Sequence, residues 1–289
     1  MTAIKMSTAP VQGAPTADTS VTAGAPPRRR SVVAPPLTRA QYLTTAVLGF
    51  LGLLAIWTAI TLSGLVNPLF LPSPLAVASA LAEQAANGQL LEDVTVSTYR
   101  VMCGYLLATV MALPIGLLAG SFARVEAVVE PIMDFIRYMP VVAFVPLTIL
   151  WVGTDDAQKF LIIWLGTFFQ QVLMVSDAVR QVPSSFRNLG ATLGLSRLQI
   201  LIRIVFPSSL PRVWDALRIS LGWAWTWLVV AELVAATSGM GYRITQAQRF
   251  LATDIIIGYV LVLGVLGLVF DQLMRAGGRS LFRYQKGRS

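Results

Sequence analysis

The chain has 289 residues, of which 55% are hydrophobic and only 12% are charged, whereas a soluble domain carries about 25% charged residues. It has no histidine and one cysteine, Cys103, which excludes an internal disulfide, a multi-cysteine metal site and histidine-based catalysis. The net charge of +8 fits the excess of Lys and Arg in cytoplasmic loops of membrane proteins, so we expect no nucleic-acid partner. The composition predicts an all-α integral membrane protein with about six spans of roughly 20 residues each.

The chain begins with a segment that is rich in Ala, Pro, Thr and Ser. Such a composition buries too little apolar surface to fold, so residues 1–40 are predicted to be a disordered cytoplasmic tail. A transmembrane domain is predicted over residues 41–278 and a basic cytoplasmic tail over residues 279–289. The first span is expected at about residues 42–64. An amphipathic helix, too polar to cross the membrane, is expected at residues 74–97.

The second span, expected at residues 98–120, carries small residues at strict intervals of four. A stripe of small residues lets two helices approach closely in lipid, where van der Waals packing replaces the hydrophobic effect. The alternative is that Ala and Gly are simply common in membrane helices. The stripe consists of Gly104, Ala108, Ala112, Gly116 and Gly120.

Two further spans contain unusual residues. The third stretch, residues 131–152, carries Pro140 and Pro146, which kink a helix and are tolerated in a membrane where protein or a wet cavity surrounds the freed carbonyls. It is therefore predicted to line a cavity. The fourth span, residues 160–178, contains Gln170 and Gln171 at its middle.

A long polar interval, residues 179–208, separates the fourth span from the fifth. Its interior is predicted to form a helix, a turn at Gly194 and a second helix. The remaining segments are a tryptophan-rich fifth span, a polar hairpin loop and a sixth span, expected at residues 213–236, 242–253 and 254–274.

The distribution of Lys and Arg predicts the orientation. A cytoplasmic amino terminus places most of the 22 basic residues inside. Arg137 and Arg218 then lie within spans, and only Arg100, Lys159, Arg243 and Arg249 lie outside. We therefore expect both termini and residues 179–208 to be cytoplasmic, in a multi-pass protein of the bacterial inner membrane.

The polar interval carries the most specific motif. It contains Asn188-Leu189-Gly190, then Gly194 after three residues, then Ile204-Val205-Phe206-Pro207 after nine more. This pattern resembles the E-A-A, G, I-x-L-P signature of binding-protein-dependent ABC importer permeases. The glycine, isoleucine and proline keep their spacing. Glu-Ala-Ala is replaced by Asn188-Leu189-Gly190, so a salt bridge from the family glutamate is not transferable. The resemblance implies an ATPase-coupling loop formed by Asn188, Leu189, Gly190, Gly194, Leu195, Ser196, Arg197 and Pro207.

Other segments resemble the nitrate, sulfonate and taurine branch of these permeases. They are PLFLP at residues 68–72, RYMP at 137–140, AELVAATSGMG at 231–241 and FLATD at 250–254. The last two are most like the taurine branch, whereas GTFFQQ at residues 166–171 is less typical of it. The resemblance covers about residues 42–285 and implies the type I importer permease fold.

The same resemblance implies several partners. They are a second permease copy, expected to form a homodimer, a cytoplasmic ATPase dimer, and a periplasmic or lipid-anchored substrate-binding protein, besides the membrane lipid itself. The chain contains no G-x-x-x-x-G-K-[ST] phosphate loop, so it is not expected to be an enzyme. We expect it to bind no cofactor and no metal, with ATP and Mg²⁺ on the partner ATPase.

Polar residues within spans are the candidates for a translocation path, because a charge in lipid is costly. Arg137 could attract an anion, or it could snorkel or pair with Asp134. Gln170 and Gln171 could contact cargo or hydrogen-bond between helices. Glu232 could belong to a gate or to a structural pair. Trp223 could line the path or anchor in the interface.

The predicted function is the permease subunit of an importer for a small anion, such as taurine or another sulfonate, nitrate, bicarbonate or a similar carboxylate. The alternative is an ion-coupled secondary transporter, which would need intramembrane acids for coupling. Few acids lie deep in the expected spans, and no inverted repeat is evident.

Overall fold

The computed structural model describes residues 38–282, and within this range it contains helices and no strand. The predicted all-α class is therefore confirmed. Residues 1–37 and 283–289, which hold most of both predicted tails, lie outside the described residues. Among the described residues, five helical segments are long and apolar enough to cross a membrane. They contain α1 (Arg39–Leu62), α3 (Gln89–Ala119), α6 (Asp156–Arg180), α9 (Phe206–Ala235) and α11 (Thr253–Leu281).

The predicted third span is a bent pair of helices. Helix α4 (Ala123–Arg137) is followed by the short helix η1 (Val141–Phe144) and by α5 (Val145–Val152), and the two arms meet at 83°. Pro140 lies directly before η1, and proline both lacks an N–H and disfavours helix in the residue before it. The chain therefore leaves α4 just before Pro140. Counting the pair as one span gives the six that were expected.

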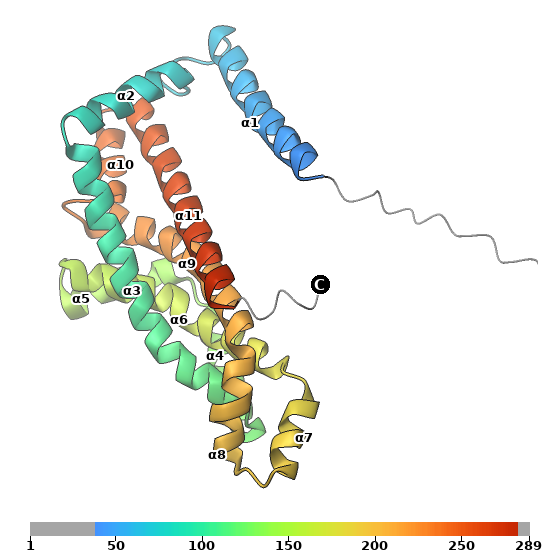
Figure 1. Ribbon diagram of the computed structural model, residues 1–289. Coiled ribbons are helices and arrows are strands. Elements are labelled where there is room, and N and C mark those ends of the chain that lie inside the picture. The colour runs from blue at the N-terminus through green and yellow to red at the C-terminus, as the bar shows by residue number, and fades with distance from the viewer. Residues whose placement is uncertain (1–37, 283–289) are drawn as a thin grey trace, which may run out of the picture. The chain divides into compact units, whose positions relative to one another are not determined.

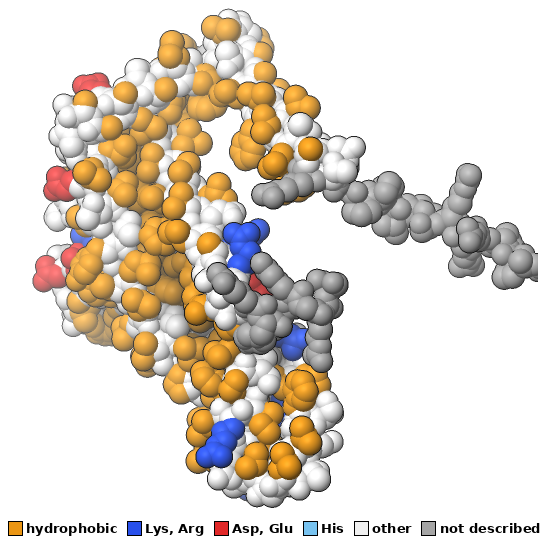
Figure 2. Space-filling model, viewed as in Figure 1, with side chains coloured by type: hydrophobic (Ala, Val, Ile, Leu, Met, Phe, Trp, Pro, Cys, Tyr) orange, Lys and Arg blue, Asp and Glu red, His pale blue; other side chains and the backbone are white. Residues whose placement is uncertain are grey.

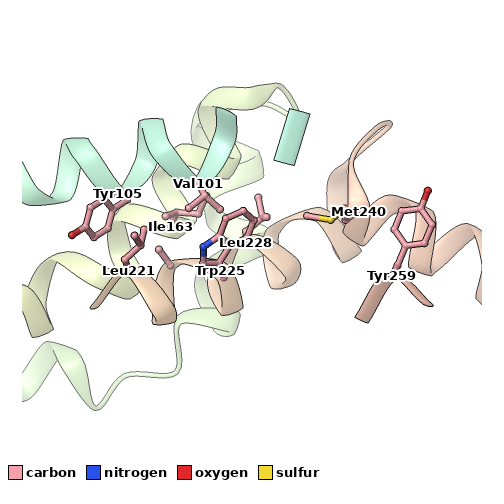
Figure 3. Packing of buried hydrophobic residues seen from close by; sticks show 9 residues of the cluster. Val101, Tyr105, Ile163, Leu221, Trp225, Leu228, Met240 and Tyr259 are labelled. Atoms are coloured by element: carbon pink, nitrogen blue, oxygen red, sulfur yellow. The ribbon is translucent and has the colours of Figure 1, made fainter. Parts of the chain in front are cut away.

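The centre of the compact unit that begins at Leu51 is formed by α3, α6 and α9. Tyr105, Ile163 and Trp225 belong to one buried cluster that joins these three helices (Figure 3). Helix α11 packs along α9, and α10 (Met240–Arg249) packs on α9 and α11. Hydrophobic side chains predominate on the face of the molecule in Figure 2, as expected for a surface that meets lipid.

Two predicted boundaries are wrong. The amphipathic helix expected at residues 74–97 ends early as α2 (Pro74–Ala86), and α3 already begins at Gln89, after Gly88 with φ of 75°. The polar hairpin loop expected at residues 242–253 is instead helix α10. One polar pair links the two places, because Asp93 of α3 binds Arg243 of α10.

The two ends of the bundle differ in structure. One end carries α7 (Ser184–Thr192), α8 (Arg197–Ile200) and the π-helical turn η2 (Leu201–Val205), which leads into α9 (Figure 1). The opposite end carries α2 and α10. Helix α11 continues to Leu281, beyond the expected sixth span at residues 254–274 and beyond residue 278, where the transmembrane domain was expected to end.

Candidate functional site

A pocket of about 490 Å³ lies where the bend after α4 meets α6 and α9. Its wall is mostly apolar and aromatic, with a few polar groups, which is typical of sites for small molecules. We call it the bend pocket. Its lining includes Arg137, Tyr138, Pro140, Gly166, Phe169, Gln170, Trp223, Thr226 and Trp227. The structure thus brings together three of the predicted path residues, namely Arg137, Gln170 and Trp223.

Among the described residues that line the bend pocket, Arg137 is the only charged one. Its Nε forms an ion pair with Asp134 at 2.9 Å, one turn earlier in α4, as the alternative interpretation expected. One terminal nitrogen donates to the Tyr138 hydroxyl at 3.0 Å. The other approaches the side-chain amide oxygen of Gln170 at 3.5 Å, which is a long contact. Because a guanidinium has five N–H donors, Arg137 can still bind a further acceptor in the pocket.

Helix periodicity and one glycine determine the positions of the two tryptophans in the bend pocket. Trp223 and Trp227 are four positions apart in α9 and both line the pocket. Trp225, between them, is buried in the core instead, with its ring 5.4 Å from that of Phe270. A Cβ on Gly166 would overlap the Trp227 ring, so only glycine permits this approach of α6 to α9.

Gln171 does not face the bend pocket. It is 1% exposed, and its amide nitrogen donates to the Thr109 hydroxyl at 3.2 Å and to the Ser220 hydroxyl at 3.0 Å. These bonds join α6 to α3 and α9. Gln171 therefore holds the bundle together, as its interhelical alternative expected.

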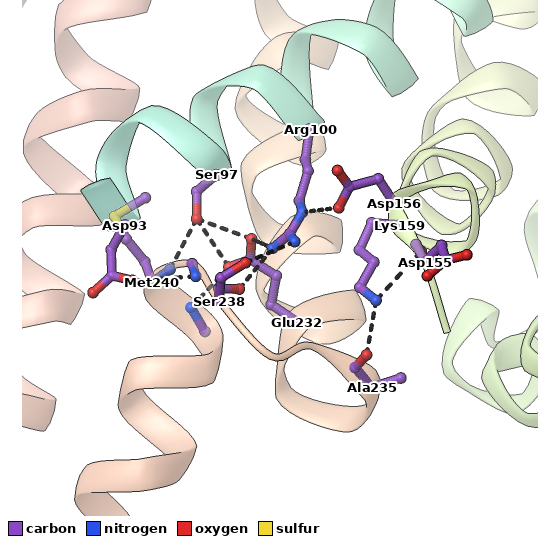
Figure 4. Close-up of polar contacts among 12 residues, drawn as sticks. Asp93, Ser97, Arg100, Asp155, Asp156, Lys159, Glu232, Ala235, Ser238 and Met240 are labelled. Atoms are coloured by element: carbon purple, nitrogen blue, oxygen red, sulfur yellow. Dashed lines mark hydrogen bonds and ion pairs between the residues drawn. The ribbon is translucent and has the colours of Figure 1, made fainter. Parts of the chain in front are cut away.

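Glu232 also lies away from the bend pocket, in a buried polar network near α10 (Figure 4). Its carboxylate accepts from Arg100 at 2.8 Å, from the Ser97 hydroxyl at 2.9 Å and from the backbone N–H of Gly241 at 2.8 Å. Arg100 additionally donates to Asp156 at 2.7 Å. The network therefore connects α3, α6, α9 and the start of α10.

Three more charged residues extend this network. Asp93 binds Arg243 at 3.0 Å and accepts from the Tyr259 hydroxyl at 2.9 Å, which joins α3 to α10 and α11. Lys159 is buried, and its ammonium donates to the carbonyls of Ala235, at 2.7 Å, and of Thr154. Every charge named here has a partner, as buried charges require.

The sequence interpretation missed most of this network because it assigned Arg100, Lys159 and Arg243 to the outer side and named no partner for them. Arg100 and Lys159 are instead buried within α3 and α6. One signal was available: Asp93, Ser97 and Arg100 recur at helical spacing and so share one face of α3. A polar stripe on one helix face predicts a polar partner on a neighbouring helix.

The structure places the candidate coupling loop at one end of the bundle. Gly194 adopts φ of 72°, a left-handed conformation that favours glycine, and it turns the chain from α7 towards α8. Ser196 caps α8 in a reciprocal arrangement with Gln199. Gly190 is buried, and a Cβ there would lie 2.7 Å from Ile204, so α7 packs closely on η2.

The other candidate residues of this loop present their side chains outward. Leu195 is half-buried, and the remainder are exposed: Asn188, Leu189, Ser196, Arg197 and Pro207. Leu193 and Leu198, beside them, are also exposed and apolar. A closely packed pair of short helices therefore carries an exposed surface of leucines and polar groups.

The small-residue stripe of α3 faces α6. A Cβ on Gly104 would lie 2.7 Å from Ile163, and one on Gly116 would lie 2.7 Å from Val175. Gly120 approaches the Ser176 carbonyl and Val179 equally closely. Ala108 and Ala112 are fully buried between them. The two helices are consequently in contact along their length.

Within residues 38–282, no group of three or more Cys, Asp or Glu side chains could hold a metal ion. Among known proteins, the family profile described as "Binding-protein-dependent transport system inner membrane component" matches residues 112–283. The chain is 32% identical over 251 residues to the taurine transport system permease protein TauC of Escherichia coli (strain K12), covering 85% of this chain and 90% of TauC.

A second relative, SsuC of Bacillus subtilis (strain 168), is named as a candidate aliphatic sulfonates transport permease. It is 33% identical over 233 residues, covering 81% of this chain and 84% of SsuC. Among solved structures, an inward-facing conformation of the MetNI methionine ABC transporter contains a similar chain, with a TM-score of 0.61 and 18% identity. That match covers 68% of this chain and 98% of the other, and it supports the predicted type I importer permease fold.

Proposed function

Because this chain belongs to the family of binding-protein-dependent transport system inner membrane components, we propose that it carries a small anion through the membrane by way of the bend pocket. The chain is a multi-pass permease subunit of an ABC importer and not itself an enzyme. Its family implies an ATPase partner and a substrate-binding protein. The alternative of an ion-coupled secondary transporter has no support among these relatives.

The proposed cargo is a sulfonate such as taurine, or an anion of similar chemistry such as nitrate, bicarbonate or a small carboxylate. The named substrates of two relatives, taurine and aliphatic sulfonates, support this class. The observation that carries the proposal is Arg137 in the bend pocket, with guanidinium donors left over beside the Gln170 amide. A guanidinium binds two oxygens of one oxyanion through paired N–H groups, and a site with a single arginine is weak enough to release its cargo.

Replacement of Arg137 tests this assignment in the importer reconstituted into liposomes with its ATPase and binding protein. Arg137→Gln removes the charge, and we expect the uptake rate of the anion to fall about tenfold or more, the effect of losing one charge-assisted pair. Arg275→Gln is the matched control, because Arg275 also pairs with an aspartate on its own helix but lies outside the pocket. Uptake by Arg137→Gln at the rate of the control would refute the bend pocket as the path.

We also propose the assembly that surrounds this path. Two copies of the chain form a homodimer, the ATPase pair binds ATP and Mg²⁺, and residues 179–208 face the cytoplasm together with both termini. Phe135 of α4 and Leu150 and Trp151 of α5 are exposed and apolar, a surface that either lipid or a second copy would cover. The exposed leucines of the coupling loop support a protein partner there.

A glycine pair offers a test of the coupling loop. Gly194→Val forces a β-branched residue into a left-handed turn, so we expect less ATPase to co-purify and slower uptake. Gly88→Val is the control, since φ is 75° at Gly88 and 72° at Gly194, and a Cβ would meet nothing within 4 Å at either glycine. Equal ATPase recovery with both variants would contradict the proposed role of the loop.

A further inference from the structure

A second pocket, of about 470 Å³, lies at the end of the bundle that carries α7 and α8. It is formed where α4 begins and where α7, α8 and η2 pack beside it. Three arginines line it, namely Arg124 of α4, Arg187 of α7 and Arg197 of α8. We call it the arginine pocket. It shares no lining residue with the bend pocket.

The positive charge of the arginine pocket is not neutralised by the described part of the chain. No Asp or Glu within residues 38–282 forms an ion pair with Arg124, Arg187 or Arg197. Glu126, in the first turn of α4, pairs with Arg180 instead. The sequence from residue 178 to residue 214 contains five arginines and no acidic residue. On the face drawn in Figure 2, this end of the molecule likewise shows basic but no acidic side chains.

Two polar atoms of residues that line the pocket are buried and have no hydrogen-bond partner within residues 38–282. They are the hydroxyl oxygen of Ser121 and Nε of Arg187, whose terminal nitrogen donates to the Val179 carbonyl at 3.1 Å. Neither atom is accessible to solvent in this structure, so an acceptor in the pocket reaches them only when the side chains around them shift. The first amides of α4 are further donors beside the pocket, because no side chain caps them.

From these observations we propose that the arginine pocket is an oxyanion site that binds a phosphate-type group. Its three guanidinium groups and the uncapped helix amides beside them are donors suited to several oxygens of one tetrahedral anion. The pocket lies where α3 ends and α4 begins, so it is at the level where spans leave the hydrocarbon. Basic pockets at that level bind phospholipid headgroups, and a free anion such as inorganic phosphate has the same chemistry.

The test uses the full chain purified in a neutral detergent, with the thermal unfolding midpoint measured against ligand concentration. One arm compares short-chain phosphatidylglycerol with short-chain phosphatidylcholine. The other arm compares sodium phosphate with sodium chloride at equal ionic strength. The variant is Arg124→Gln combined with Arg197→Gln, because both side chains are exposed and neither forms an ion pair within residues 38–282. The control is Arg203→Gln, an exposed arginine of η2 outside the pocket.

We expect saturable stabilisation by phosphatidylglycerol or by phosphate, weakened about tenfold or more in the double variant and unchanged in Arg203→Gln. Stabilisation by phosphatidylglycerol alone identifies a lipid headgroup as the ligand, and stabilisation by phosphate as well identifies a free oxyanion. Loss of stabilisation in Arg203→Gln as large as in the double variant would mean general charge attraction and would overturn the proposal. The absence of saturable binding in both arms would also overturn the proposal. The arginines would then be expected to bind acidic side chains of the ATPase. Neither result depends on what the permease carries.

Discussion

Replacement of Arg100 by alanine is the strongest test of the buried polar network. Arg100 is 4% exposed, and it donates to Asp156, to Glu232 and, through two nitrogens, to Ser238. In Arg100→Ala, Asp156 can turn to solvent because its side chain is 45% exposed. Glu232 cannot, since it is 1% exposed, and it keeps only Ser97 and the backbone N–H of Gly241 as partners.

The expected cost follows from this asymmetry. Removing one partner of a buried ion pair leaves an uncompensated charge and costs about 3–5 kcal/mol, whereas an exposed pair contributes about 0–1 kcal/mol. Arg100→Ala should therefore lower the free energy of unfolding by about 3–5 kcal/mol. Arg275→Ala, which breaks the exposed pair with Asp271, should lower it by less than about 1 kcal/mol.

The assay is denaturant unfolding of the purified chain in detergent micelles, extended to a double-mutant cycle with Glu232→Gln. Because Gln has no charge to leave uncompensated, the double variant should lose less stability than the two single variants added together. Strict additivity, or a cost for Arg100→Ala no larger than that for Arg275→Ala, would refute the conclusion that a buried charge pair holds these helices together.

Two further predictions concern α6 and its neighbours. Gly116→Leu should lower the free energy of unfolding by about 1–3 kcal/mol, because the new side chain would overlap Val175, whereas Gly264→Leu, where a Cβ meets nothing within 4 Å, should change it little. Equal unfolding midpoints for these two variants would contradict the close contact of α3 and α6. Gln171→Leu should cost about 1–3 kcal/mol by leaving two buried hydroxyls without their amide partner. Gln170→Leu should cost clearly less in the same measurement, and the reverse order would show that the two glutamines were assigned to the wrong faces.

The span pattern could be predicted from the sequence because it depends on composition alone. A helix in lipid must satisfy its own backbone, so any apolar run of sufficient length is predicted to be a spanning helix. The same logic explains the errors at α3 and α10. Hydropathy assigns polar residues such as Asp93 and Arg243 to the outside, yet these two pair with each other across helices that are remote in sequence.

The site was only partly predictable for a related reason. Arg137 was found because a basic residue close to Pro140 is conspicuous in an apolar stretch. The partner of Glu232 was not found, because Arg100 is 132 positions away and nothing local connects the two residues. Gln170 and Gln171 were treated alike, although adjacent residues on a helix point in different directions and cannot both line one pocket.

The two faces of α6 explain why the proposed path lies at the bend. On the face towards α3, the contacts of Gly104 and Gly116 leave no room even for a Cβ, so water and cargo are excluded there. On the opposite face, the chain between α4 and α5 is irregular around Pro140 and lines the bend pocket. Irregular backbone is stable at membrane depth only where protein or a wet cavity surrounds it. The break in the helix and the pocket are thus one structural feature, and a bundle closed along α3 leaves that side of α6 for the proposed path.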